Sequence, residues 1–138
     1  MLPDLSALAR DHLDRVRAFY DSAPTEPKAG AKAYRALLAH YYNLLIPPHA
    51  SVLEIGCGSG DLLSRLHAGR KVGIDLSPTQ IAAARTRTPD AEFFVQAGEI
   101  LEIPDRFDVI IVSDTRLPRS VSARCSIAGS PRCSSGFV

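Results

Sequence analysis

The chain has 138 residues, which is enough for one domain and too few for two. Hydrophobic residues make up 46% of it and charged residues 22%, as in a globular protein and unlike a disordered or collagen-like chain. No apolar run reaches the roughly 18 residues of a membrane-spanning helix, and the first residues lack a secretory signal pattern. No membrane association is therefore expected, and the expected location is cytoplasmic.

The net charge is +1, so the chain as a whole has no strong field that would attract nucleic acid. Its charges are unevenly distributed, because residues 115–138 hold four arginines and no acid. Residues 1–114 hold twelve basic and fifteen acidic residues, a net charge of −3. The three cysteines, Cys57, Cys125 and Cys133, match the spacing of neither a disulfide framework nor a zinc site, so no metal is expected.

Two helices are predicted at the start of the chain. Apolar residues recur at helical spacing over residues 5–20, and the turn-rich residues 21–26 that follow are expected to be a solvated connection. The second helix covers about residues 31–45 and ends before two prolines. We expect its large apolar stripe to pack in the core, with a lid over a ligand as the alternative. The stripe consists of Tyr34, Leu37, Leu38, Tyr41 and Leu45.

Apolar segments then alternate with helical patterns. Ser77 is suited to cap a helix that has Pro78 at its first position. Continuous apolar strands separated by helices indicate a parallel sheet covered on both faces. The expected fold class is therefore α/β, doubly wound and mostly parallel, with right-handed crossovers. Strands are predicted at residues 51–55, 71–75, 91–95 and 107–112, and helices at residues 61–67 and 78–85.

The most informative segment is the glycine-rich turn that follows the first of these strands, EIGCGSG at residues 54–60. Gly56, Gly58 and Gly60 allow a sharp turn, positive φ angles and close approach of the backbone to a ligand. Asp75 ends the next strand, nineteen positions after Gly56. In a parallel sheet its carboxylate would lie beside the turn, where it can accept hydrogen bonds from ribose hydroxyls. The order of strand, glycine turn, helix, second strand and acid is more specific for a nucleotide site than a glycine pattern alone.

This turn resembles motif I of the class I S-adenosylmethionine-dependent methyltransferases, E/D-x-G-x-G-x-G, which begins here at Glu54. The resemblance covers residues 31–114 and includes VGIDLSPTQIAAAR and FDVIIVSDT, which are similar to the family's second-strand and fourth-strand motifs. It implies a Rossmann-like sheet with the strand order 3-2-1-4-5-7-6, S-adenosylmethionine as cofactor, and enzymatic methyl transfer. The acceptor and the oligomeric state are not determined by the sequence.

The resemblance also implies roles for single residues. Asp75 would hold the ribose hydroxyls, Leu76 would pack against adenine, and Glu99 is the acid nearest the position that bonds the adenine amino group. Ser113 and Asp114 would face the transferred methyl group at the end of the fourth strand, and Asp114 is the candidate general base. Glu54 and Gly56 would line the methionine part of the cofactor. The expected cofactor-binding positions are Glu54, Gly56, Cys57, Gly58, Gly60, Asp75, Leu76, Glu99 and Ser113.

Two alternative functions stay open. An oxidoreductase with a nicotinamide dinucleotide usually has the pattern G-x-G-x-x-G, and Asp61 stands here in place of the third glycine. A non-enzymatic remnant or interaction module would instead use the basic residues 115–138 to contact a partner. Titration with S-adenosylmethionine and with NAD distinguishes a methyltransferase from the oxidoreductase. Deletion of residues 115–138 tests the interaction module, which would lose its partner.

Residues 115–138 follow neither the helical nor the strand period, and they contain six serines, four arginines, two prolines and two cysteines. We therefore expect an N-terminal helical segment at 1–46, a cofactor-binding core at 47–114 and an irregular tail at 115–138. The abrupt change is typical of translation in a shifted reading frame. On this interpretation the chain is a truncated methyltransferase with little activity alone, and a genuine short form with a binding tail is the alternative.

Overall fold

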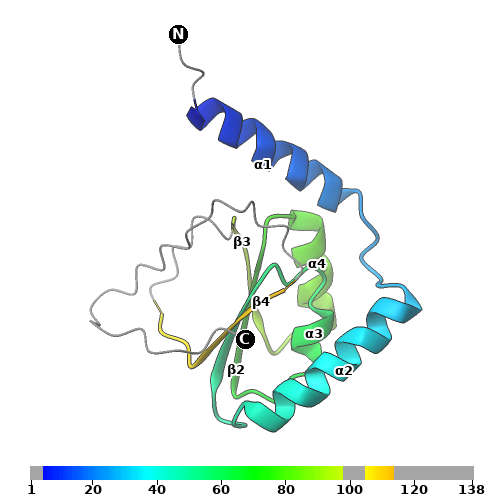
Figure 1. The fold of residues 1–138 in the computed structure, drawn as a ribbon, viewed down its shortest axis with the longest axis vertical. Coiled ribbons are helices and arrows are strands. Elements are labelled where there is room, and N and C mark those ends of the chain that lie inside the picture. Colours follow the sequence, from blue (N-terminus) through cyan, green and yellow to red (C-terminus); the bar gives the residue numbers. More distant parts are fainter. Residues whose placement is uncertain (1–4, 98–104, 114–138) are drawn as a thin grey trace.

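A computed structural model of the protein describes residues 5–97 and 105–113. In these two ranges, no helix is long and apolar enough to cross a membrane. The chain order of the elements is two helices, then strands and helices in alternation, and finally two strands (Figure 1). The elements are α1 (Leu5–Asp21), α2 (Ala29–Leu45), β1 (Ser51–Ile55), α3 (Asp61–Ser64), β2 (Arg70–Asp75), α4 (Pro78–Arg87), β3 (Glu92–Val95) and β4 (Val109–Val112).

The four strands form one parallel sheet in the order β3-β2-β1-β4. Leu53 of β1 is in register with Val72 of β2 on one side and with Ile110 of β4 on the other. This arrangement confirms the predicted α/β class, and its order is the 3-2-1-4 part of the order that the sequence resemblance implies. The ends of β1 and β2 lie side by side, so the segments that follow them share one edge of the sheet.

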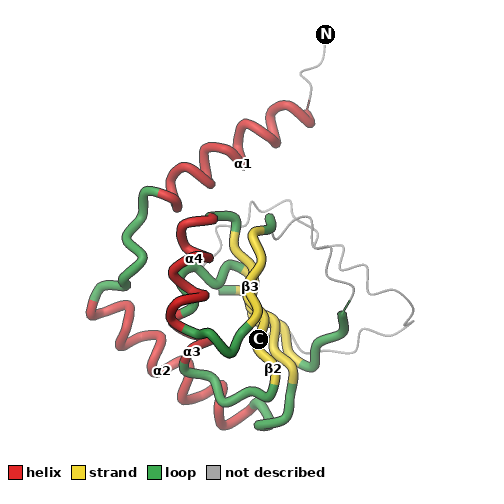
Figure 2. The backbone as a smooth tube through the Cα atoms, turned by 180° about the vertical axis from the view of Figure 1, so that it is seen from behind, coloured by secondary structure: helices red, strands yellow, loops and turns green. Residues whose placement is uncertain are grey.

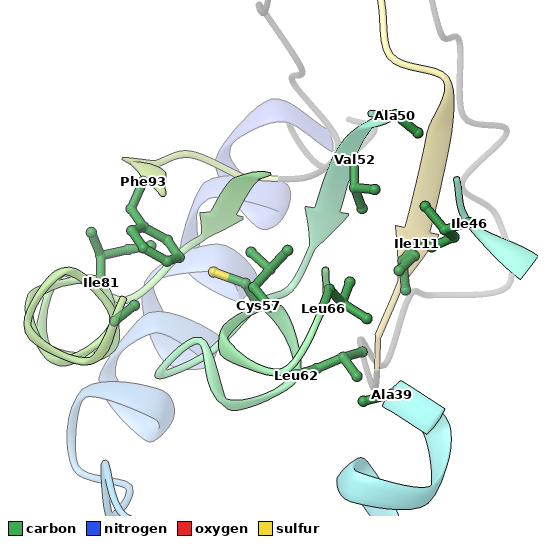
Figure 3. Close-up of a cluster of buried hydrophobic side chains, with 12 residues drawn as sticks. Ala39, Ile46, Ala50, Val52, Cys57, Leu62, Leu66, Ile81, Phe93 and Ile111 are labelled. Atoms are coloured by element: carbon green, nitrogen blue, oxygen red, sulfur yellow. The ribbon is translucent and has the colours of Figure 1, made fainter. Parts of the chain in front are cut away.

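Helices α2, α3 and α4 lie on one side of the sheet (Figures 1 and 2). Their apolar residues pack with one face of the strands in the larger core cluster, which is drawn in Figure 3. Because side chains alternate along a strand, Leu53, Val72 and Ile74 project to the opposite face and form a separate buried cluster. The larger cluster consists of Ala39, Ile46, Ala50, Val52, Cys57, Leu62, Leu63, Leu66, Ile81, Ala84, Phe93 and Ile111.

Local sequence accounts for the bounds of the helices after β1 and β2. Ser77 caps α4 as predicted, since its side chain accepts a hydrogen bond from the Gln80 amide at 3.2 Å and Pro78 follows it. Helix α3 is shorter than the predicted span of residues 61–67. Asn43 of α2 explains its early end, because the Asn43 side chain donates to the Arg65 carbonyl and accepts from the His67 amide, both at 2.9 Å. These are backbone groups just past the helix end.

The prediction that the large apolar stripe of α2 packs in the core is wrong for most of its members. Tyr34, Leu37, Tyr41 and Leu45 are all more than half exposed. The face that packs instead carries Ala39, which is buried, and Leu38 and Tyr42, which are partly buried against the core; Ile46, just past the end of the helix, is also buried. Both faces have helical spacing, so periodicity alone could not select the one that contacts the sheet.

Gly73 in β2 explains how closely β3 and the turn after β1 pack against that strand. A Cβ atom at Gly73 would lie 2.7 Å from the Phe93 ring and 2.9 Å from the Cys57 sulfur. We expect Gly73→Ala to lower the free energy of unfolding by about 1–3 kcal/mol through overpacking. Gly30→Ala is the control, because nothing lies within 4 Å of a Cβ there. Denaturant unfolding of wild type and both variants measures these free energies. A Gly73→Ala variant as stable as wild type would contradict the prediction.

Candidate functional site

The glycine turn between β1 and α3 folds back over the end of β2. Its three glycines have positive φ angles of 76° at Gly56, 52° at Gly58 and 74° at Gly60, which residues with a Cβ rarely adopt. The amides of Gly56 and Cys57 both donate to the Ile74 carbonyl, at 2.8 and 3.0 Å. The turn is thereby fixed to the last residues of β2.

Asp75, the last residue of β2, lies against this turn as the parallel arrangement predicted. Its Oδ2 accepts a hydrogen bond from the Gly58 amide at 2.9 Å, and its Oδ1 accepts one from the Ser77 amide at 2.9 Å. A carboxylate offers about four acceptor positions, and the backbone amides use two of them. Asp75 therefore both holds the turn and keeps capacity to accept hydrogen bonds from a ligand.

The other residues of the turn divide into those that face open space and those that face the core. A Cβ at Gly58 would meet only the Gln80 side-chain oxygen, at 3.9 Å, so the space over Gly58 is open. At Gly60 it would lie 3.1 Å from Ala84 and 3.3 Å from Phe93, so that glycine permits close packing. The Cys57 thiol is buried in the core, and burial raises its pKa far above the usual value. Only the backbone of Cys57 can line the site.

Glu54 of β1 is a buried carboxyl with one unsatisfied oxygen. It is 2% exposed, its Oε1 accepts a hydrogen bond from the Ser113 hydroxyl at 2.5 Å, and its Oε2 has no partner among the described residues. Burial raises the pKa of Glu54 to about 8, although the Ser113 hydrogen bond and the positive charge of Arg35 act in the opposite direction. Glu54 is therefore largely protonated at neutral pH.

Three carboxyl groups, those of Glu54, Asp61 and Asp75, belong to the carboxyl ends of β1 and β2 and to the start of α3. The charges of Asp75 and Asp61 both raise the pKa of Glu54, so the three interact electrostatically. Asp61 is buried at the start of α3, where its Oδ1 lies 3.3 Å from the Arg65 guanidinium and its Oδ2 has no partner among the described residues. The arrangement favours a ligand with positive charge and disfavours one with negative charge.

A small pocket opens beside the end of β4. Its volume is about 160 Å³, and it lies between α2 and the residues that follow the glycine turn and β4. Ser113, the hydrogen-bond partner of Glu54, is part of its wall. The wall consists of Tyr34, Arg35, Leu38, Tyr42, Leu62, Val112 and Ser113.

The remaining expected site residues lie partly beyond the structure's description. Leu76 is half-buried directly after Asp75, and Ser113 follows β4. Glu99 and Asp114 lie outside the described residues. Within residues 5–97 and 105–113, no group of three or more His, Cys, Asp or Glu side chains could hold a metal ion.

The last residues of α1 and the segment after it make contacts that no pattern in the sequence indicates, and the prediction of a solvated connection over residues 21–26 is wrong for part of that segment. The Gln80 side chain donates to the carbonyls of Tyr20 and Ala23, at 3.3 and 3.2 Å. The Ser77 hydroxyl donates to the Asp21 carboxylate, and the Thr79 amide donates to the same carboxylate at 3.4 Å. The end of α1 and the connection that follows it are therefore bound at the start of α4.

A family model for a methyltransferase domain matches residues 52–124, which is more than half of the chain. The chain belongs to this methyltransferase domain family. The match includes the glycine turn, Asp75 and the four strands apart from Ser51. Among curated proteins, the ribosomal protein L11 methyltransferase of Burkholderia mallei is 30% identical over 98 residues, which are 68% of this chain and 33% of that protein. The chain thus spans about a third of the length of this relative.

Solved methyltransferase structures share the fold. The magnesium protoporphyrin IX methyltransferase of Synechocystis, crystallised with bound S-adenosylmethionine, has a TM-score of 0.58 at 18% identity, covering 72% of this chain and 60% of that chain. A TehB-like S-adenosylmethionine-dependent methyltransferase from Corynebacterium glutamicum has a TM-score of 0.50 at 25% identity, covering 78% of this chain and 55% of that chain. The sheet of this chain therefore has the methyltransferase fold as far as β4.

The raised pKa of Glu54 predicts a specific pH dependence of stability. The folded state holds a proton on Glu54 up to about pH 8, whereas the unfolded chain releases it near 4.5, so this contribution to stability falls as pH rises between these values. We expect wild type to lose stability relative to Glu54→Gln by up to about tenfold in the folding equilibrium per pH unit. Denaturant unfolding of both proteins from pH 5 to 8 measures this. Parallel curves would show that Glu54 is ionised in the folded protein.

Proposed function

We propose that the chain is the S-adenosylmethionine-binding part of a methyltransferase. The observation that carries the proposal is the Asp75 carboxylate held against an open glycine turn, with Glu54 and Asp61 near enough to interact with it electrostatically. S-adenosylmethionine carries a positive sulfonium and a positive ammonium group, which this negative environment favours. Family membership supports the same conclusion, as do S-adenosylmethionine-bound solved structures with this fold.

The turn and the end of β2 would bind the nucleoside part of the cofactor. The free acceptor positions of the Asp75 carboxylate suit the two ribose hydroxyls, and the open space over Gly58 admits the cofactor close to the backbone. Leu76, next in the chain, would pack against adenine. The acid expected to bond the adenine amino group, Glu99, remains a prediction.

The end of β1 would bind the methionine part. The Glu54 carboxyl has one oxygen without a partner among the described residues, and a nearby positive group would lower the pKa of Glu54 and favour its ionised form. Ser113 holds the other oxygen and also lines the pocket beside β4. We infer that the methyl acceptor approaches through this pocket, between α2 and β4.

The bound cofactor would supply an electrophilic methyl group: a nucleophile bonds to the methyl carbon in line with the C–S bond, and S-adenosylhomocysteine leaves as a neutral thioether. The task of this chain's residues is then to orient the two reactants and exclude water. A general base is needed only where the acceptor must lose a proton, and Asp114 remains the predicted candidate.

The second candidate function, an oxidoreductase with a nicotinamide dinucleotide, has less support. Such a cofactor places its pyrophosphate over the glycine turn, at the N-terminus of the following helix, and this chain has the buried carboxyl of Asp61 there in place of the third glycine. A diphosphate there would meet the negative charges of Asp61 and Asp75. The methyltransferase proposal requires no such repulsion.

We also propose that this chain alone transfers methyl groups weakly or not at all. Its match covers one third of the length of the ribosomal-protein relative, and β4 is the edge of the described sheet. The prediction that residues 115–138 result from a shifted reading frame belongs to the same proposal. Translation of the other two frames tests it, since a continuing strand-and-helix pattern in one of them is expected.

Loss of the Asp75 carboxylate should weaken cofactor binding. We expect Asp75→Ala to lower the affinity for S-adenosylmethionine by about tenfold or more, because hydrogen bonds to a charged acceptor are lost. Asp108→Ala is the matched control, since the Asp108 carboxylate also accepts from a backbone amide, that of Ser51 at 2.8 Å, but at the opposite end of the sheet. Calorimetric titration of both variants and wild type measures the affinities.

Thermal unfolding of the same samples separates binding from stability. Asp75→Ala and Asp108→Ala should both lower the unfolding temperature, because each removes hydrogen bonds to the backbone. Only Asp75→Ala should change the affinity. Unchanged affinity in Asp75→Ala would contradict the proposed ribose site.

A further inference from the structure

Residues 20–26 are bound to both ends of α4. At its first turn, Ser77, Thr79 and Gln80 hold Tyr20, Asp21 and Ala23 through the hydrogen bonds described above. At its last residue, the Arg87 guanidinium donates to the Glu26 carboxylate from Nη2 at 2.6 Å. Figure 1 shows the connection from α1 to α2 next to α4. We call residues 20–26 the brace.

Arg87 connects the brace to the glycine turn. Its Nη1 donates to the Ser59 carbonyl at 2.7 Å and lies 2.6 Å from the Ser59 hydroxyl, while Nη2 holds Glu26. The Arg87 side chain is 20% exposed, and Ser59 is buried. Lys32 of α2 also pairs with Glu26, at 3.2 Å. One guanidinium thus joins the turn to a segment about thirty residues earlier in the sequence.

We propose that Arg87 is a positioning residue that holds the glycine turn in its ligand-binding conformation, and that Glu26 of the brace fixes the orientation of Arg87. The proposal is separate from the contacts assigned to the cofactor, since Arg87 acts on the backbone of Ser59. It gives the N-terminal residues a role in the site without direct ligand contact.

The physical argument is the flexibility of the turn. Gly56, Gly58 and Gly60 allow many backbone conformations, so a single one is populated only if surrounding contacts select it. Asp75 holds the turn at Gly58, and Arg87 holds it one residue later at Ser59. A guanidinium bonded to a carboxylate on one nitrogen is itself restricted in rotation, which makes its other nitrogen a fixed donor.

Amide hydrogen exchange of the turn tests the proposal directly. The Gly58 and Gly60 amides donate to Asp75 and to the Cys57 carbonyl, so both are protected when the turn is ordered. We expect Arg87→Met to speed their exchange by about tenfold. Arg85→Met is the matched control, because Arg85 lies in the same last turn of α4 and donates to a backbone carbonyl, that of Phe93 at 2.8 Å. It should leave both amides unchanged.

A second variant covers the case in which Arg87→Met fails to fold. Glu26→Gln removes the carboxylate charge at a residue whose side chain is 70% exposed, so it should leave the fold intact. We expect it to speed exchange at Gly58 and Gly60 by a few-fold, and not at the Val72 amide of the sheet centre. Exchange of the turn that matches wild type in Glu26→Gln, or equal acceleration in Arg85→Met and Arg87→Met, would overturn the proposal.

The effect on ligand affinity rests on the proposed function and uses S-adenosylhomocysteine as probe. Arg87→Met should bind S-adenosylhomocysteine about tenfold more weakly than Arg85→Met does, when both are titrated well below their unfolding temperatures. Equal affinities would overturn the positioning role. If wild type does not bind the probe, the proposed function fails, and the exchange rates of Gly58 and Gly60 still decide the role of Arg87.

Discussion

The hydrogen bond from the Gly58 amide to the Asp75 carboxylate is the contact on which the site depends. It joins the turn after β1 to the end of β2, and it exists because these strands are adjacent, parallel and in register from Ser51–Arg70 to Ile55–Ile74. The turn can approach the end of β2 this closely only because two glycines leave room for neighbouring side chains. Gly73 leaves the room that Phe93 and Cys57 occupy beneath the turn, and Gly60 leaves room for Ala84. The packing of the core thereby determines the position of the carboxylate.

Electrostatics gives this geometry its preference among ligands. A buried carboxyl such as Glu54 lowers stability unless it is protonated or paired, and here a single hydroxyl, that of Ser113, is its hydrogen-bond donor among the described residues. Asp61 and Asp75 add negative charge to the same region. A local arrangement that is unfavourable for folding is common where a ligand completes it. A positively charged cofactor would stabilise these groups, and a diphosphate would not.

The sequence predicted the parts of the fold that local patterns encode. Apolar strands separated by helices indicated the parallel sheet, the spacing from the glycine turn to Asp75 indicated their contact, and Ser77–Pro78 indicated the start of α4. Contacts between distant segments were not predictable. The burial of Ala39 in place of Tyr41 depends on which face of α2 meets the sheet, and the brace depends on single hydrogen bonds from α4. Neither leaves a periodic pattern.

The most direct test of the central claim is a pair of calorimetric titrations of the wild-type chain, one with S-adenosylmethionine and one with NAD, under identical conditions at neutral pH. If the three carboxyl groups and the open turn select a positively charged cofactor, S-adenosylmethionine binds with a measurable dissociation constant and NAD gives no heat above dilution. Binding of NAD without binding of S-adenosylmethionine would contradict the account.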